Sequence, residues 1–280
     1  MNTQDSLSPA VPTTQIAHGR FLPELTLQDV RKAAPAVFGR TARHMTDRYQ
    51  QVKTGQVLEG LLERGYRITM AKQEQARKRD PLTVRHMLTL AHEKALARRD
   101  YKEGVPTLLV VNSHNGRSTL KFSTGFYRFI CANRLIVGTT EQEFVFRHAA
   151  KPLAGLDAAL EQLLERTRIS LEHMADWQRI TLSDRKVVSF AQKAAELRFG
   201  AEAARGYPQE SVLRPRRAGD EANDLWHVMN RVQENLVRGG VEGKSANGRR
   251  VTSKSVNNIT LDLAFNRGLW TLAEEFAEAA

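Results

Sequence analysis

The segment that decides the fold class is 107-TLLVVNSHNGRSTLKF-122. Two runs rich in β-branched and aliphatic residues, Thr107–Val111 and Ser118–Phe122, flank a polar turn that contains Asn115-Gly116. An Asn-Gly pair between two such runs is a strong signal of a β-hairpin. The segment therefore predicts two antiparallel strands at the centre of a sheet.

The turn Asn112-Ser113-His114-Asn115 has two interpretations. Asn and Ser side chains bond to the backbone of tight turns, so these residues can serve the turn alone. A nuclease site would need acidic metal ligands close by, and the predicted hairpin contains no carboxylate. The turn interpretation is therefore favoured over an active site.

Strands and helices alternate on the N-terminal side of the hairpin. A short strand at Tyr49–Lys53 precedes a helix from Gly55 to Arg64, Gly65 stops that helix, and Tyr66–Lys72 alternates as a strand. The run Gln73–His86 carries four cations and predicts a solvated turn or a basic hairpin tip.

On the C-terminal side, 123-STGFYRFICANRLIVG-138 predicts an apolar helix that ends near Asn133, followed by a strand at Leu135–Val137. The alternating segment 142-QEFVFRHA-149 is expected to pair with that strand. In this helix Phe122, Phe126 and Phe129 would share one face and pack in the core.

Beyond Pro152 the pattern is purely helical. One helix covers Leu156–Trp177, and a second begins after a Ser183 N-cap and ends near Gly200. The predicted fold is α+β, an antiparallel β-sheet with packed helices followed by a helical C-terminal segment. The predicted divisions are a disordered arm at 1–20, an α+β core domain at 21–199, a linker at 200–219, and a C-terminal pair of helices with a basic Gly-rich loop at 220–280.

The charge balance points to a polyanionic partner. The 280 residues include 42 Lys and Arg against 31 Asp and Glu, which gives a formal net charge of +11. Nucleic acid is the first candidate, and an acidic membrane surface is the second. No apolar stretch approaches the ~20 residues of a membrane-spanning helix, and the N-terminus lacks the order of a signal peptide. We therefore expect a cytoplasmic protein with no membrane partner.

Catalytic and metal-binding patterns are missing from the sequence. The single cysteine, Cys131, excludes an intramolecular disulfide and a cysteine-rich zinc site. The eight histidines include no HExxH or His-x-His spacing. The carboxylates Asp220, Glu221 and Asp224 are placed to favour a helix N-terminus. We expect no catalytic residue, no metal site and no cofactor.

The segment 238-RGGVEGKSANGRRVTSK-254 looks at first like the phosphate-binding loop of an NTPase. That motif needs a glycine where Arg238 stands and a strand before the loop, whereas the preceding apolar residues have helical spacing. Nucleotide hydrolysis is therefore not expected. Five cations, four glycines and three hydroxyls remain well suited to a polyphosphate backbone. The alternative is a solvated loop with no ligand.

Two blocks, 111-VNSHNGRSTLKFSTGFYRFICANRLIVG-138 and the stretch from Gln233-Glu234-Asn235-Leu236 to Asn266-Arg267-Gly268-Leu269-Trp270, carry a family resemblance. In them the chain resembles the prophage- and plasmid-encoded proteins typified by YfjQ and YafZ. The resemblance covers nearly the whole chain. It implies an origin in a mobile element and supplies no catalytic residues.

The order strand, helix, strand, hairpin, helix also resembles, in topology only, the single-strand annealing proteins of the RecT, Red-beta and Erf type. This second resemblance implies an oligomeric ring or filament that holds a DNA strand in a basic groove. A shared order of elements does not by itself establish a function.

The leading hypothesis is therefore a non-enzymatic mobile-element protein that binds nucleic acid without sequence preference, with single-stranded DNA favoured and annealing carried out by a homo-oligomer. The alternative is an interaction protein that inhibits or modulates a host defence or restriction factor. Tyr127 beside Arg128 is the best surface pair for base stacking. The predicted nucleic-acid contacts are Arg117, Lys121, Tyr127, Arg128, Arg134, Arg238, Lys244, Arg249, Arg250 and Lys254.

Overall fold

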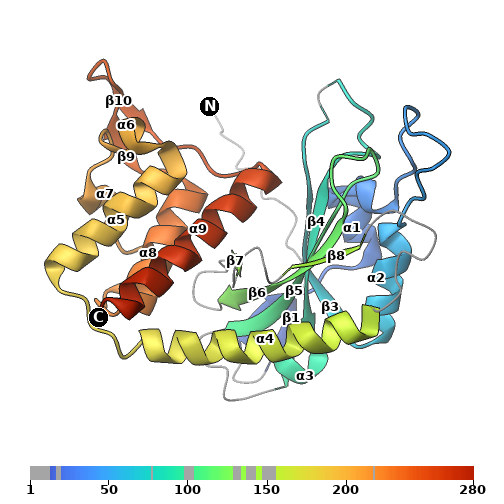
Figure 1. The fold of residues 1–280 in the computed structure, drawn as a ribbon, viewed down its shortest axis with the longest axis horizontal. Coiled ribbons are helices and arrows are strands. Elements are labelled where there is room, and N and C mark those ends of the chain that lie inside the picture. Colours follow the sequence, from blue (N-terminus) through green and yellow to red (C-terminus); the bar gives the residue numbers. More distant parts are fainter. Residues whose placement is uncertain are drawn as a thin grey trace, which may run out of the picture.

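The computed structural model describes residues 13–16, 20–76, 78–97, 104–128, 134–136, 143–146, 156–216 and 218–280. Figure 1 shows a sheet with its covering helices on one side of the molecule and a group of helices on the other, with one long helix running along both. The architecture is α+β, as predicted.

Six strands form the main sheet, and all of its pairings are antiparallel. They are β3 (Tyr66–Gln73), β4 (His86–His92), β5 (Gly104–Asn112), β6 (Leu120–Arg128), β7 (Arg134–Ile136) and β8 (Phe144–Phe146), in the order β3-β4-β5-β6-β7 with β8 also on β6. β5 and β6 are the predicted hairpin, with Val111 opposite Lys121. Gly116 in the turn has φ +73, a conformation that favours glycine.

Strand β6 corrects two sequence predictions. It continues to Arg128, so the helix predicted over residues 123–133 is wrong in its described part. The i, i+4 spacing of Phe122 and Phe126 fits both a strand face and a helix face, which explains the error. β8 pairs with β6 rather than with β7. Residues 129–133, which include Phe129 and Cys131, lie outside the described residues.

The N-terminal part of the chain matches its predicted elements with one exception. Helix α2 (Thr54–Glu63) ends before Gly65, which has φ +82, and β3 follows. The strand predicted at Tyr49–Lys53 does not form. Within the predicted arm, β1 (Thr13–Ile16) pairs with β2 (Arg20–Pro23), and residues 1–12 and 17–19 lie outside the described residues.

One face of the sheet is covered by α1 (Leu27–Ala33), α2 and the first turns of α4 (Leu156–Trp177). Their side chains form one apolar core with the strands. Its fully or nearly buried members include Val30, Leu58, Leu61, Ile68, Leu90, Val110, Phe122 and Leu160. A short α3 (Glu93–Leu96) follows β4.

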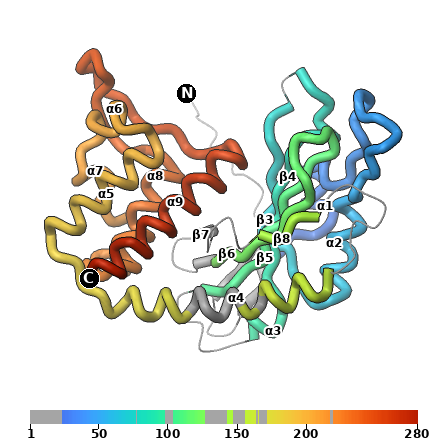
Figure 2. Tube along the Cα trace, viewed as in Figure 1, coloured from blue at the N-terminus to red at the C-terminus, as the bar shows by residue number. Residues whose placement is uncertain are grey.

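A second core lies among α5 (Asp184–Phe199), α8 (Leu225–Arg238), α9 (Ile259–Glu278) and the end of α4. Ser183 caps α5, as predicted, by accepting a hydrogen bond from Lys186 N. The rings of Trp177 and Trp270 pack with centroids 4.5 Å apart. Figure 2 shows these C-terminal helices, in yellow to red, gathered beside the sheet. We call this group the helical cluster.

The segment expected as a linker at 200–219 is folded onto the helical cluster. It forms α6 (Ala201–Ala204) and α7 (Gln209–Leu213), and Ala204 and Val212 are buried in the second core. Asn235 of α8 fixes α7, because its Nδ2 donates to the carbonyl oxygens of Val212 at 2.7 Å and of Arg214 at 2.9 Å. A lack of helical periodicity in the sequence therefore reflects short helices here rather than a free connection.

Helix α9 joins the two halves of the molecule. Ile259 and Leu263 in its first turns pack on Met87, Leu109 and Val111 of the sheet. Its middle residues, with Phe265, Leu269 and Trp270 buried, belong to the second core. The same helix thus contacts the sheet with one face and the helical cluster with the other.

Candidate nucleic-acid interface

A basic groove of about 910 Å³ lies between α9 and the β5–β6 end of the sheet. We call it the sheet–α9 groove. Four of its lining residues are cations and none is a carboxylate. It is lined by Arg85, Val111, Gly116, Arg117, Ser118, Thr119, Lys121, Thr260, Leu263, Ala264, Arg267, Gly268 and Thr271.

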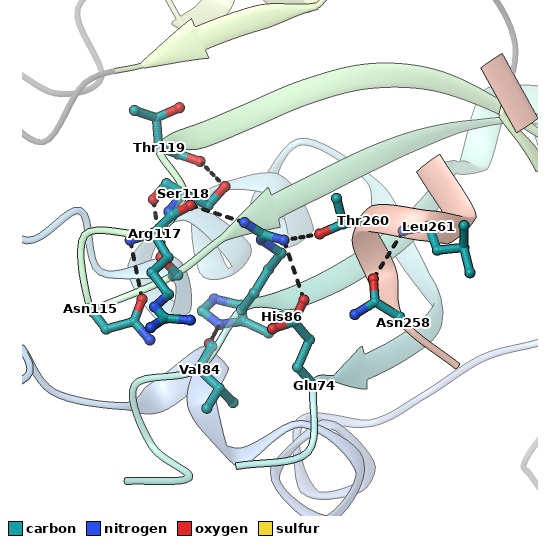
Figure 3. A network of polar contacts seen from close by, with 12 residues as sticks. Glu74, Val84, His86, Asn115, Arg117, Ser118, Thr119, Asn258, Thr260 and Leu261 are labelled. Carbon is teal, nitrogen blue, oxygen red and sulfur yellow. Dashed lines mark hydrogen bonds and ion pairs between the residues drawn. The ribbon is translucent and has the colours of Figure 1, made fainter. Parts of the chain in front are cut away.

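Arg85, which directly precedes β4, ties the two walls of this groove together. Its Nη2 donates to the carbonyl oxygen of Arg117 at 2.9 Å, and its Nη1 lies 3.3 Å from Oε1 of Glu74 and also contacts Oγ1 of Thr260. Figure 3 shows this network between the hairpin turn at Arg117 and the first turn of α9 at Thr260. Arg85 thereby holds the hairpin turn against α9.

Lys121 and Arg267 face each other from the two walls and share one counterion. Nζ of Lys121 lies 3.0 Å from Oε2 of Glu143, and Arg267 contacts the other oxygen of the same carboxylate. Burial is the main cause that lowers the pKa of Lys121, and the charges of Arg267 and Arg85 lower it further. The two neighbouring cations are the smaller causes of this shift, and a bound anion would reduce their repulsion of Lys121.

Arg117 is the exposed cation of the groove. Its backbone N–H donates to Oδ1 of Asn115 at 3.2 Å, which fixes the turn, while its guanidinium makes no ion pair within the described part of the chain. An exposed guanidinium at the rim of a basic groove is placed to contact a phosphate oxygen.

The Asn112-Ser113-His114-Asn115 turn is buried and serves the fold. Nδ2 of Asn112 donates to the Val52 carbonyl oxygen at 3.0 Å and to Oγ1 of Thr54 at 2.9 Å. Oγ1 of Thr54 lies 2.8 Å from Nε2 of His86, whose ring centroid is 5.0 Å from that of His114. Burial, with the nearby His114 as a second cause, lowers the pKa of His86 to about 3. These contacts attach the hairpin to α2.

The basic Gly-rich segment forms a second, separate basic surface. It folds into a hairpin of β9 (Glu242–Lys244) and β10 (Arg250–Thr252), which Figure 1 places beside α6 at the end of the helical cluster. The element before it is α8, so the strand that an NTPase loop requires is not there. The segment is therefore an ordered hairpin rather than a loose loop.

The structure distributes the predicted contact residues over three places. Arg117 and Lys121 line the sheet–α9 groove, and Tyr127, Arg128 and Arg134 lie at the opposite end of β6, where Tyr127 pairs with Arg134. The side chains of these last three residues lie outside the described part of the structure. The remaining predicted contacts belong to the β9–β10 hairpin and its flanks, namely Arg238, Lys244, Arg249, Arg250 and Lys254.

One of these hairpin residues is already engaged within the fold. Arg238 at the end of α8 lies 3.1 Å from Oε1 of Glu234, whose side chain is 2% exposed. Lys244, Arg249, Arg250 and Lys254 are exposed. They are the better candidates for an external phosphate.

Sequence reasoning missed Arg85 and Arg267 as site residues. Arg85 belongs to a basic run whose sequence indicates a solvated tip, and its contacts with Glu74 and with Thr260 of α9 leave no local pattern. Arg267 carried a weak signal. The groove-facing residues of α9 are spaced three or four apart and form a stripe of their own, beside the apolar stripe that packs in the second core. They are Thr260, Leu263, Arg267 and Thr271.

Two other classes of site do not occur in the described residues. Among them, no group of three or more His, Cys, Asp or Glu side chains is arranged to hold a metal ion. No described helix combines the length and apolar content that crossing a bilayer requires.

The fold and the site define an α+β protein with a basic groove between an antiparallel sheet and a C-terminal helical cluster. Residues 42–270 match the family described as "Domain of unknown function (DUF932)", and the chain belongs to that family.

The chain is similar to two curated proteins of Escherichia coli strain K12. It is 32% identical over 257 residues to UPF0380 protein YfjQ and 31% identical over 255 residues to UPF0380 protein YafZ. Each alignment covers 89% of this chain and 90% of the relative. These matches confirm the YfjQ/YafZ-type family. No solved structure gives a significant match. The element order that suggested annealing proteins is not the observed one, because the strand predicted at Tyr49–Lys53 does not form and the described part of the helix predicted over residues 123–133 is strand β6.

Proposed function

We propose that this chain binds nucleic acid without sequence preference and that single-stranded DNA is its favoured ligand. One observation carries the proposal. The sheet–α9 groove places the exposed Arg117 beside Arg85, Lys121 and Arg267, and no carboxylate lines it, although Glu74 and Glu143 behind the lining pair with these three cations. Cations that meet successive phosphates supply affinity without reading bases.

The apolar part of the groove supports a single strand over a duplex. Val111, Leu263 and Ala264 lie among the cations. Unpaired bases expose faces and edges that can contact apolar side chains, whereas a duplex hides those faces in its stack. The mixture of cations and apolar surface therefore suits a strand whose bases are accessible.

Strand annealing by a homo-oligomer is the more specific form of this proposal. Its support is the presence of two separate basic surfaces on one chain, at the sheet–α9 groove and at the β9–β10 hairpin. If it holds, the pure protein accelerates the pairing of complementary oligonucleotides and forms rings or filaments visible by electron microscopy. A strict monomer that leaves the annealing rate unchanged would remove the annealing part and leave the binding part standing.

The binding part is tested by anisotropy titration of labelled single- and double-stranded DNA of matched length at several salt concentrations. We expect tighter binding to the single strand and an affinity that falls steeply with salt, because bound cations release counterions. No salt-sensitive binding to either form would overturn the proposal. A stable complex with a host protein that survives nuclease treatment, in the absence of DNA binding, would favour the host-factor alternative.

A further inference from the structure

A second groove, of about 920 Å³, lies between the α5–α6 junction and the β9–β10 hairpin. We call it the hairpin groove. It shares no lining residue with the sheet–α9 groove. Its lining includes Phe199, Gly200, Arg205, Tyr207, Lys244 and Ser245.

The two walls of the hairpin groove are fixed to each other by close backbone packing. The N–H of Lys244 donates to the Gly206 carbonyl oxygen at 2.7 Å. A Cβ on Gly206 would lie 2.1 Å from the Lys244 oxygen, and one on Gly243 would lie 2.6 Å from Cδ1 of Tyr207. The backbones therefore meet in a way that only glycine permits, and the cations on both walls project from a preorganised frame.

Each wall of the hairpin groove carries one exposed cation. Arg205 and Lys244 are exposed and come from opposite sides, and Glu202 is the one carboxylate among the lining residues. Lys244 is the direct cross-strand partner of Arg250. Opposed like charges on neighbouring strands destabilise a hairpin, and a bound anion removes that penalty. Arg249 in the turn adds a further exposed cation, and Glu242 on β9 is the nearby exposed carboxylate.

The hairpin groove also has an accessible stretch of backbone and two aromatic rings in its lining. Gly248 has φ +73 and nothing within 4 Å of the position that a Cβ would occupy, so its backbone is open to a close ligand. Phe199 and Tyr207 stack with centroids 4.2 Å apart and an interplanar angle of 18°. Exposed cations beside an open backbone suit the sugar–phosphate chain of a single strand, and the two rings, which stack on each other, add apolar surface to the lining.

We propose that the hairpin groove is a second binding site for single-stranded nucleic acid, so that one chain holds two strand segments at once. The inference rests on the proposed function of the sheet–α9 groove. Because the two grooves share no residue, each site is removed by substitutions that leave the other intact. A chain with two such sites can bring two strands, or two parts of one strand, to a fixed separation.

The test counts short oligonucleotides bound per chain by native mass spectrometry. A thymidine oligonucleotide of about four residues is at the lower end of single-strand site sizes, so each copy is expected to fill one groove. The full chain should bind two copies at saturation. The Arg205→Ala/Lys244→Ala variant should bind one, since neither side chain makes a described contact within the fold, and the Arg117→Ala/Lys121→Ala variant should also bind one.

The outcomes separate the two proposals. Arg185→Ala is the matched control, because it removes an exposed cation of α5 that lines neither groove, and it should still bind two copies. If the unmodified chain binds one oligonucleotide and only the Arg117→Ala/Lys121→Ala variant loses it, the second site is overturned and the first is kept. No copy on any variant overturns the proposed function itself.

Discussion

Nζ of Lys121 on β6 lies 3.0 Å from Oε2 of Glu143, a carboxylate whose side chain is 4% exposed. The other oxygen of Glu143 contacts Arg267 of α9, so one buried anion joins the sheet to the helical cluster. The same carboxylate reduces the positive charge that the sheet–α9 groove presents to a ligand. Glu143 therefore stabilises the fold and at the same time weakens the binding of an anionic ligand.

Glu143→Gln separates these two roles. The neutral amide leaves Lys121 and Arg267 without their shared counterion, and we expect a loss of up to about 3 kcal/mol in the free energy of unfolding. Single-stranded DNA should bind more tightly, with a steeper salt dependence. Denaturant unfolding and anisotropy titration measure the two effects. Glu161→Gln, an exposed carboxylate on α4, is the control, and an affinity for DNA no higher than that control would contradict the assignment of the groove.

Asn235→Ala tests the folding of the 200–219 segment. The substitution removes the donor to the carbonyl oxygens of Val212 and Arg214 and the acceptor that lies 2.6 Å from Nε of Arg216. Buried polar groups that lose their partners cost about 1–3 kcal/mol each, so we expect a loss of about 3 kcal/mol. Proteolysis should then cut this segment first. Gln192→Ala, which removes one exposed side-chain contact on α5, should change stability little.

Gly206→Ala tests the close packing of the hairpin groove. The added Cβ would lie 2.1 Å from the backbone oxygen of Lys244, so the hairpin must move and the unfolding midpoint should fall. Gly60→Ala is the matched control, because its Cβ in α2 meets only the end of the Arg64 side chain at 3.4 Å. That control should gain about 0.5–1 kcal/mol from helix propensity. Equal effects of the two substitutions would show that the hairpin is not anchored at Gly206.

The buried histidine predicts an acid-sensitive fold. The pKa of His86 falls from its ordinary 6.5 to about 3, and the nearest titratable ring is that of His114. Between these two pH values His86 is protonated in the unfolded chain and neutral in the folded chain. Stability is therefore fully present above pH 6.5 and falls toward pH 3, by up to about 1.4 kcal/mol per pH unit. In His86→Gln the unfolding midpoint should change less with pH between 3 and 6.5 than in the unmodified chain. The same pH dependence in both proteins would refute the burial of a neutral His86 ring.

The sequence predicts the parts of this fold that depend on local signals. The Asn115-Gly116 turn, the stop at Gly65 and the Ser183 cap are each set by a few neighbouring residues. The continuation of β6 past Phe122 was not predictable in the same way. Its apolar spacing fits a helix equally well, and only pairing with β5 selects the strand.

The candidate site was predictable only in part for a similar reason. Arg117 was found because it sits in a recognisable turn, and Lys244 because it lies in a Gly-rich basic run. Arg267 becomes a groove residue only when α9 packs against the sheet, and Glu143 only when it reaches both walls. Contacts between residues far apart in sequence have no local pattern.

The most direct test of the central claim is the salt dependence of single-stranded DNA binding to the unmodified chain and to Arg117→Ala. We predict that the negative slope of log affinity against log salt becomes shallower by about 0.7 in Arg117→Ala, because the substitution removes one cation that neutralises a phosphate. The slope of Arg185→Ala should equal that of the unmodified chain. Identical slopes and affinities for the unmodified chain and Arg117→Ala would contradict nucleic-acid binding in the sheet–α9 groove.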